Sequence, residues 1–284
     1  MKRMIMKRIL LCVGALSLWG MGAITGAVSA EEILKTADDA WPTEPIINVD
    51  YKALVSVADI NHTGQISTSY FGLPIGTGTM NSLVWNDAGN TLKFQINRVD
   101  VFGYNSASTY PKGKSGHSDY GYGCGFINVN LGGNPITSST TQKLSIYDGK
   151  LAIQGNGVSV DIIADTKSDV FVLKIDDSRP APSAITIDLV MLQDPDVTIG
   201  THTAVLRTSD SDGQIRLQQT FEQPAATGYT EFDHYCSSAL VIDVKGRSAS
   251  VSYPDAKTIR LTLPAGNETF YVYMASDASM ERSA

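Results

Sequence analysis

The sequence predicts an all-β protein, a large antiparallel β-sandwich that follows a signal peptide. Three observations predict this fold class. Apolar and polar residues alternate in about a dozen short segments, turn signals separate the segments, and no sustained helical period lies between them. Strands at this spacing are typical of antiparallel sheets that stack face to face. No repeat of fixed period is visible, which disfavours a propeller or a solenoid.

The first thirty residues have the order of a secretory signal peptide. Four basic residues lie within the first eight, an apolar run extends from Ile9 to Trp19, and small residues lead to Ala30. We expect cleavage near Ala30 and export to the periplasm or the extracellular space. The apolar run is interrupted by glycines and is shorter than a bilayer requires, so we expect no membrane span in the mature chain.

The remaining residues are expected to form one domain with short flanking segments. Residues 31–48 contain Pro42 and Pro45 without a sustained period, which indicates a lead-in linker. Residues 49–275 carry the alternating pattern and are long enough for one large β domain. Residues 276–284 are expected to be a C-terminal tail or the start of a missing linker.

The strands are predicted where the period is two or where a short apolar run has strand length. Turn signals such as Asp148-Gly149 and Gly155-Asn156-Gly157 lie between them. The predicted strands, in chain order, are 54–59, 91–96, 126–130, 143–147, 149–153, 158–163, 170–175, 184–190, 203–206, 239–244, 259–263 and 269–274.

Charge and motif content exclude several classes of function. Loss of the four cations of the signal peptide changes the net charge from −7 to −11, which disfavours nucleic acid as a partner. His62, His117, His202 and His234 lack the spacing of metal ligands, and the short glycine-rich stretches lack the dinucleotide fingerprint. We therefore predict no metal and no cofactor.

Two cysteines remain after export, Cys124 and Cys236. An oxidising compartment permits a disulfide between them. The same residues can equally be two buried small hydrophobic side chains, and the sequence leaves both possibilities open.

Two stretches are rich in side chains that could contact a sugar. Pyranose rings have apolar C–H faces that stack on aromatic rings, and their hydroxyls need directional hydrogen-bond partners. The alternative is that these residues have a purely structural role. Tyrosines commonly pack on sheet surfaces. Asp100 can pair with Arg98, since residues two apart share a strand face. The candidate carbohydrate-binding residues are Trp85, Arg98, Asp100, Tyr104, His117, Asp119, Tyr120 and Tyr122.

The block from Leu73 to Phe102 resembles a known family. Leu73-Pro74-Ile75-Gly76-Thr77-Gly78, followed by a strand and Arg98-Val99-Asp100, is similar to the N-terminal β-sandwich of α-L-fucosidases in glycoside hydrolase family 95. It is closer to the related domain of unknown function 5703. Thr77 stands where relatives usually have asparagine, and Phe102 where many have tryptophan.

This resemblance implies a role in carbohydrate processing, with the catalytic carboxylates on a helical barrel that follows the sandwich. This sequence contains no such barrel, so a partner encoded downstream is implied. The first hypothesis is therefore a secreted, non-catalytic accessory domain. The alternatives are a free-standing carbohydrate-binding module and a glycoside hydrolase in its own right, which would depend on Asp100 or Asp119.

Overall fold

The computed structural model describes residues 49–87, 90–105, 117–191, 198–199, 202–209, 215–222 and 237–279. The predicted signal peptide, the whole of the predicted linker and the last residues of the tail lie outside this range. The chain separates into two units, Met1–Asp50 and Tyr51–Ala284.

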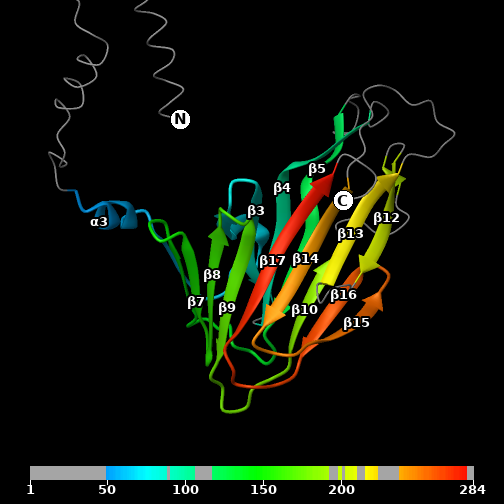
Figure 1. The fold of residues 1–284 in the computed structure, drawn as a ribbon. Helices are drawn as coiled ribbons and strands as arrows, with labels where there is room; N and C mark the ends of the chain where they lie inside the picture. The colour runs from blue at the N-terminus through cyan, green and yellow to red at the C-terminus, as the bar shows by residue number, and fades with distance from the viewer. Residues whose placement is uncertain are drawn as a thin grey trace, which may run out of the picture. The chain divides into compact units, whose positions relative to one another are not determined.

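The described residues form two antiparallel sheets that pack against each other (Figure 1), which confirms the predicted all-β sandwich. Seventeen strands, one short α-helix and one 3-10 turn are present among them. The strand pairs are antiparallel throughout, as in β2 with β3, β8 with β9 and β14 with β17. Chain neighbours therefore pair as hairpins in much of the molecule.

The larger sheet has ten strands, and β17 lies near its middle, between β9 and β14. In spatial order its strands are β1 (Ile60–Thr63), β6 (Thr141–Ser145), β7 (Lys150–Gln154), β8 (Val158–Asp165), β9 (Val170–Asp177), β17 (Phe270–Ser279), β14 (Ser237–Lys245), β13 (Ile215–Glu222), β12 (His202–Ser209) and β11 (Thr198–Ile199).

The smaller sheet has seven strands, with β15 at one edge and β2 at the other. In spatial order its strands are β15 (Ser250–Asp255), β16 (Thr258–Leu263), β10 (Ile185–Val190), β5 (His117–Asn130), β4 (Thr91–Asn105), β3 (Met80–Asp87) and β2 (Leu73–Gly76).

The core lies between the sheets. Successive side chains on a strand face opposite ways, so every second residue points toward the other sheet. On β17, Phe270, Val272 and Met274 have no exposed surface, whereas Tyr271 and Tyr273 between them are 38% and 37% exposed. The same alternation on β4 buries Leu92, Phe94 and Ile96 completely. These residues from both sheets belong to one hydrophobic cluster.

A buried pair of amide side chains also joins the sheets. Asn86 of β3 donates from Nδ2 to Oε1 of Gln142 on β6 at 3.1 Å, and Gln142 donates from Nε2 to Asn86 Oδ1 at 3.0 Å. Asn86 Oδ1 also accepts from the Ile66 backbone N–H, and Gln142 Nε2 donates to the Gly64 carbonyl. Burial of these polar groups is tolerated because they are hydrogen-bonded.

The prediction of a strand at 54–59 is wrong. Tyr51–Ser56 form the helix α3, and none of its residues is buried. Leu54 is 59% exposed and Val57 is 85% exposed, so this apolar run does not contribute to the core. A short apolar run does not distinguish a strand from a helix by its period, and here no neighbouring strand pairs with it.

The last strand is longer than its sequence pattern indicates. The predicted segment ends at Met274, but β17 extends to Ser279 because Ala275–Ser279 pair with Val241–Ser237 of β14. The first residues of the expected tail therefore belong to the sheet. Among the described residues, no helix is long and apolar enough to cross a membrane.

Candidate functional site

Arg98 and Asp100, two of the predicted site residues, form a bidentate ion pair on β4. Arg98 Nε lies 2.8 Å from Asp100 Oδ1, and Nη2 lies 2.9 Å from Oδ2. The Arg98 side chain is 9% exposed and that of Asp100 is 48% exposed. This confirms that the two residues pair across one strand face.

Arg98 also connects the two sheets. Its Nη1 donates to the Ser276 carbonyl of β17 at 2.7 Å and to Oδ2 of Asp169 at 3.0 Å. Asp169 lies in the turn between β8 and β9, where its φ of 55° is a left-handed conformation that aspartate tolerates better than most residues. The Arg98 guanidinium, which comes from the smaller sheet, therefore binds three groups. The Asp100 carboxylate belongs to the same strand, and the other two groups belong to the larger sheet and its β8–β9 turn.

Thr77 completes this cluster. Its hydroxyl donates to Asp169 and accepts from the Met80 backbone N–H at 2.9 Å, while its own N–H donates to the Met80 carbonyl at 2.8 Å. A threonine hydroxyl thus closes the turn between β2 and β3, a role that asparagine also performs in tight turns. The difference from the family block at this position is compatible with the same local fold.

The electrostatics of the pair favour ionised groups. The hydrogen bonds from Arg98 lower the pKa of the Asp100 carboxyl, and Asp100 raises the pKa of the Arg98 guanidinium. A general acid in glycoside hydrolysis needs the opposite, a carboxyl whose pKa is raised so that it carries a proton near neutral pH. The geometry of Asp100 therefore suits a structural anion.

Trp85 lies in the core. Its side chain is 9% exposed and belongs to the buried hydrophobic cluster. So small an exposed fraction leaves little ring surface on which a sugar could stack. Arg98 and Trp85 thus come from adjacent strands, but neither presents a free surface.

The other candidates lie at the far end of the β4–β5 hairpin. Gly103 is paired with Tyr120 and Asn105 with His117, so the backbone brings Tyr104 close to the segment that holds His117, Asp119 and Tyr120. The side chains of Tyr104 and of these β5 residues, with that of Tyr122, lie outside what the structure describes. Their contact with a sugar stays a prediction.

Cys124 is buried, with 2% of its surface exposed. Cys236 lies outside the described residues, so the disulfide stays a prediction. No group of three or more potential metal-ligating side chains occurs in the described part of the chain.

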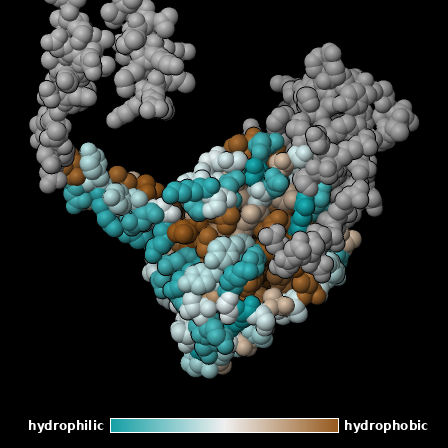
Figure 2. Space-filling view, in the orientation of Figure 1, coloured by the Kyte–Doolittle hydropathy of each residue, from teal (hydrophilic) through white to brown (hydrophobic). Residues whose placement is uncertain are grey.

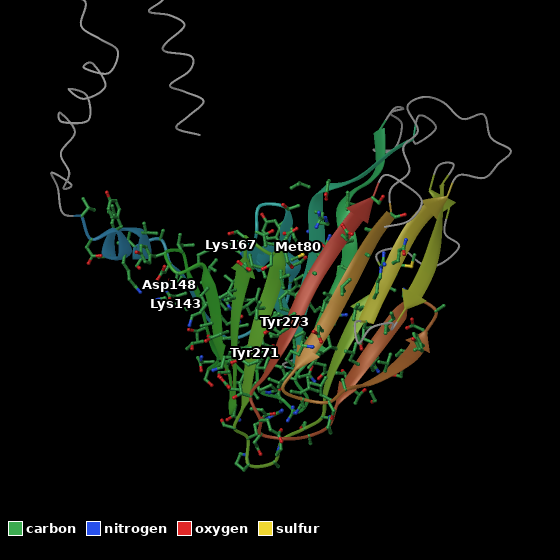
Figure 3. All side chains as sticks on the ribbon, viewed as in Figure 1. Met80, Lys143, Asp148, Lys167, Tyr271 and Tyr273 are labelled. Atoms are coloured by element: carbon green, nitrogen blue, oxygen red, sulfur yellow. The ribbon has the colours of Figure 1, made fainter. Side chains whose placement is uncertain are left out.

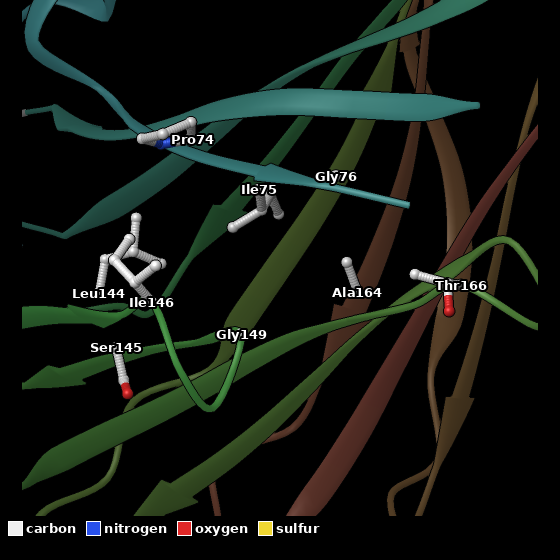
Figure 4. Close-up of a pocket in the computed structure, with 9 residues that line it drawn as sticks. All are labelled: Pro74, Ile75, Gly76, Leu144, Ser145, Ile146, Gly149, Ala164 and Thr166. Atoms are coloured by element: carbon white, nitrogen blue, oxygen red, sulfur yellow. The ribbon is translucent and has the colours of Figure 1, made fainter. Parts of the chain in front are cut away.

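A pocket of about 310 Å³ lies where the open edge of β2 faces the larger sheet. Figure 4 shows Pro74, Ile75 and Gly76 on one side of it, with Ala164 and Thr166 on the other. Its remaining lining comes from Leu144, Ser145, Ile146 and Gly149 around the β6–β7 turn. No ionisable side chain lines it, so it offers no group for acid or base chemistry.

The outer face of the larger sheet carries two tyrosines that the sequence analysis did not single out. Tyr271 and Tyr273 are successive outward-facing residues of β17, in line along the strand (Figure 3). Apolar surface gathers toward the middle of this face, with hydrophilic residues around it (Figure 2). The sequence could have indicated this pair, because apolar residues alternate with tyrosines from Phe270 to Met274. That alternation places the tyrosines on the face of the strand opposite the core.

A second exposed group lies on the outer side of the smaller sheet, near its β2 edge. The 3-10 turn η2 (Ser69–Phe71) lies against β3, where the backbone at Gly72 closely approaches Leu83. Tyr70 is 86% exposed and Phe71 is 70% exposed, and their rings meet edge to face at 5.1 Å between centroids. We call Tyr70, Phe71 and Leu83, which is 38% exposed, the edge patch.

Comparisons with known proteins identify no family. No family model and no curated protein matches the sequence. Among solved structures the chain resembles one described as "Putative kojibiose phosphorylase from human microbiome", with a TM-score of 0.46 and 10% sequence identity. The matched region covers 80% of this chain and 33% of that protein, so the chain spans about a third of its length. A similarity this low assigns neither a family nor an activity.

Proposed function

We propose that this chain is an exported, non-catalytic β-sandwich domain that serves a carbohydrate-processing protein by docking to its helical catalytic domain. The observation that carries the proposal is the edge patch. Two adjacent aromatic side chains stand 86% and 70% exposed on a short turn instead of packing on the sheet. Such an apolar surface marks an interaction site more often than an isolated exposed side chain does.

Two further observations support a non-catalytic role. Asp100, an acid within the block that resembles α-L-fucosidases, is paired with Arg98, which lowers the pKa of its carboxyl. Tyr70 and Phe71 of the edge patch lie just before that block, and Leu83 lies within it. The apolar surface thus adjoins, and partly overlaps, the part of the sequence with a family resemblance.

The test is complex formation between the full exported chain and the helical domain encoded next to it. We expect one-to-one association by analytical ultracentrifugation. The Tyr70→Ser/Phe71→Ser double variant should weaken it about thirtyfold, because exposure of a large apolar side chain in place of its burial costs about 2 kcal/mol.

Tyr253→Ser is the matched control, because Tyr253 is 54% exposed on β15, at the opposite edge of the same sheet. This variant should bind as the wild type does. Absence of a helical domain beside the gene, or equal binding by the double variant, would contradict the proposal.

The second candidate function is a free-standing carbohydrate-binding module. It is favoured by one specific observation, the pair of exposed tyrosines on the outer face of the larger sheet. A glycan array on the full exported chain tests it, and the two functions are compatible because the tyrosines and the edge patch lie on different sheets.

A further inference from the structure

The outer face of the ten-stranded sheet presents an ordered row of aromatic and aliphatic side chains. Tyr271 and Tyr273 lie two residues apart on β17, which places them about 7 Å apart along the strand on one face. The register sets Val172 of β9 opposite Tyr273, and Ile163 of β8 opposite Val172. We call Ile163, Val172, Tyr271 and Tyr273 the tyrosine face.

Charged residues flank this face in the same register. Lys174 and Lys245 are the two cross-strand neighbours of Tyr271, and Asp243 is a cross-strand neighbour of Tyr273. Directly opposite residues of antiparallel strands project to the same side of the sheet. The tyrosine rings therefore lie among ammonium and carboxylate groups.

The charges around the tyrosine face neutralise one another. Lys174 lies 2.7 Å from Asp176, Lys245 lies 2.7 Å from Asp243, and Lys150 lies 3.4 Å from Asp161. The hydrogen bond to Asp176 raises the pKa of Lys174, and the same bond lowers the pKa of Asp176, so this pair stays charged at neutral pH. These three ion pairs carry no net charge. Neither an anionic nor a cationic ligand gains from such a surface.

The chemistry of the face fits a glycan better than a docked protein. Ion pairs alternate with apolar side chains here, whereas the centre of a protein interface is depleted of charged residues. Each lysine ammonium has three donors and each carboxylate several acceptor sites, so groups remain for sugar hydroxyls beyond those used within the ion pairs. The tyrosine rings add flat apolar surfaces with polar tips.

We infer that the tyrosine face is a binding site for a neutral glycan chain, in which Tyr271 and Tyr273 stack on sugar rings while Lys174, Lys245 and Asp243 bond to hydroxyls. This inference rests on the carbohydrate role proposed above and specifies its ligand class and its site. The middle of a broad sheet offers an open surface, which suits an extended polymer.

Affinity electrophoresis of the full exported chain tests this site. The neutral probes are xylan, galactomannan, laminarin and dextran, and the anionic probes are alginate and polygalacturonate. We expect the wild type to be retarded by at least one neutral polymer. The Tyr271→Ala/Tyr273→Ala variant should bind that polymer about tenfold more weakly, as loss of two aromatic contacts implies.

Control variants distinguish the stacking of tyrosine rings on sugars from a loss of folding stability and from docking to the helical domain. Tyr271→Phe/Tyr273→Phe keeps both rings and should retain most of the binding, and urea unfolding should show that the alanine variant is folded. Because the ligand is neutral, raising the salt from about 50 to about 500 mM should leave the affinity unchanged. The edge-patch variant Tyr70→Ser/Phe71→Ser should bind glycan as the wild type does.

Three outcomes would overturn the inference: no retardation by any neutral polymer, equal binding by the alanine variant, or binding to anionic polymers alone. Loss of association with the helical domain in the alanine variant, with glycan binding intact, would also overturn it, because the tyrosine face would then be a protein interface. Failure of the glycan test leaves complex formation through the edge patch to be judged by its own measurement.

Discussion

At the scale of single residues, Arg98 has the most consequential contacts. The sequence predicted its pairing with Asp100, because residues two apart on a strand share a face. Its bonds to Asp169 and to the Ser276 carbonyl join positions 71 and 178 residues away, and no local pattern indicates them. Arg98, predicted as a possible sugar contact, thus also links the two sheets through hydrogen bonds.

We predict that Arg98→Ala lowers the free energy of unfolding by about 2–3 kcal/mol. Breaking a fully buried ion pair costs about 3–5 kcal/mol, and the cost is smaller here because both carboxylates are partly exposed. Urea unfolding measures it. Arg260→Ala is the control, since Arg260 is 40% exposed in its pair with Asp188 and should cost under about 1 kcal/mol.

The pH dependence of the same comparison checks the cause. Because Arg98 lowers the pKa of Asp100 below its usual 3.8, the pair stabilises the folded state above that value. This contribution is lost as the pH falls through the lower folded-state pKa. The difference between wild type and Arg98→Ala should therefore narrow below about pH 4. A constant difference down to pH 2 would assign the effect to packing instead.

At the scale of elements, the two buried amides show how a strand of one sheet is fixed to a strand of the other. Asn86 on β3 and Gln142 on β6 satisfy each other and two backbone groups. Their side chains have almost no exposed surface. Removal of one amide leaves the other buried without its partner, which is costly in a low-dielectric interior.

We predict that Gln142→Ala destabilises the fold by about 2–3 kcal/mol. Asn86→Leu/Gln142→Leu should cost less than the sum of its two single variants, because the double change removes both partners together. A double-mutant cycle by urea unfolding measures this coupling. Strict additivity would indicate that the two amides act independently.

Sequence patterns predicted many of the strands that have a buried face, but not β13, whose Ile215 and Leu217 are buried. The segments 158–163 and 170–175 fall within β8 and β9, where Val160, Ile162, Leu173 and Ile175 are buried. The edge strand β15, none of whose residues is buried, was also missed. The helix α3 was mistaken for a strand because its apolar residues face solvent, and burial is what makes a period informative.

The candidate site was less predictable than the fold. The aromatic residues chosen from the sequence were those near glycine-rich bends, and one of them, Trp85, belongs to the core. Tyr271 and Tyr273 were assigned to a strand without being recognised as a surface pair. Their significance depends on the neighbours that β9 and β14 supply, and strand order is not readable from one sequence.

At the scale of the whole molecule, the sandwich presents two different exposed surfaces on the outer sides of its two sheets. The edge patch on the smaller sheet is aromatic and apolar, whereas the tyrosine face on the larger sheet mixes aromatic rings with neutralised charges. We propose that the first surface binds a protein and the second a glycan. Under this proposal, the domain would bring a polymer to a catalytic partner.

Turnover of aryl glycosides by the full exported chain, alone and then mixed with the adjacent helical domain, tests this account most directly. The account predicts no turnover by the chain alone and turnover by the mixture. Hydrolysis by the chain alone, abolished by Asp100→Asn or Asp119→Asn in a folded variant, would contradict it.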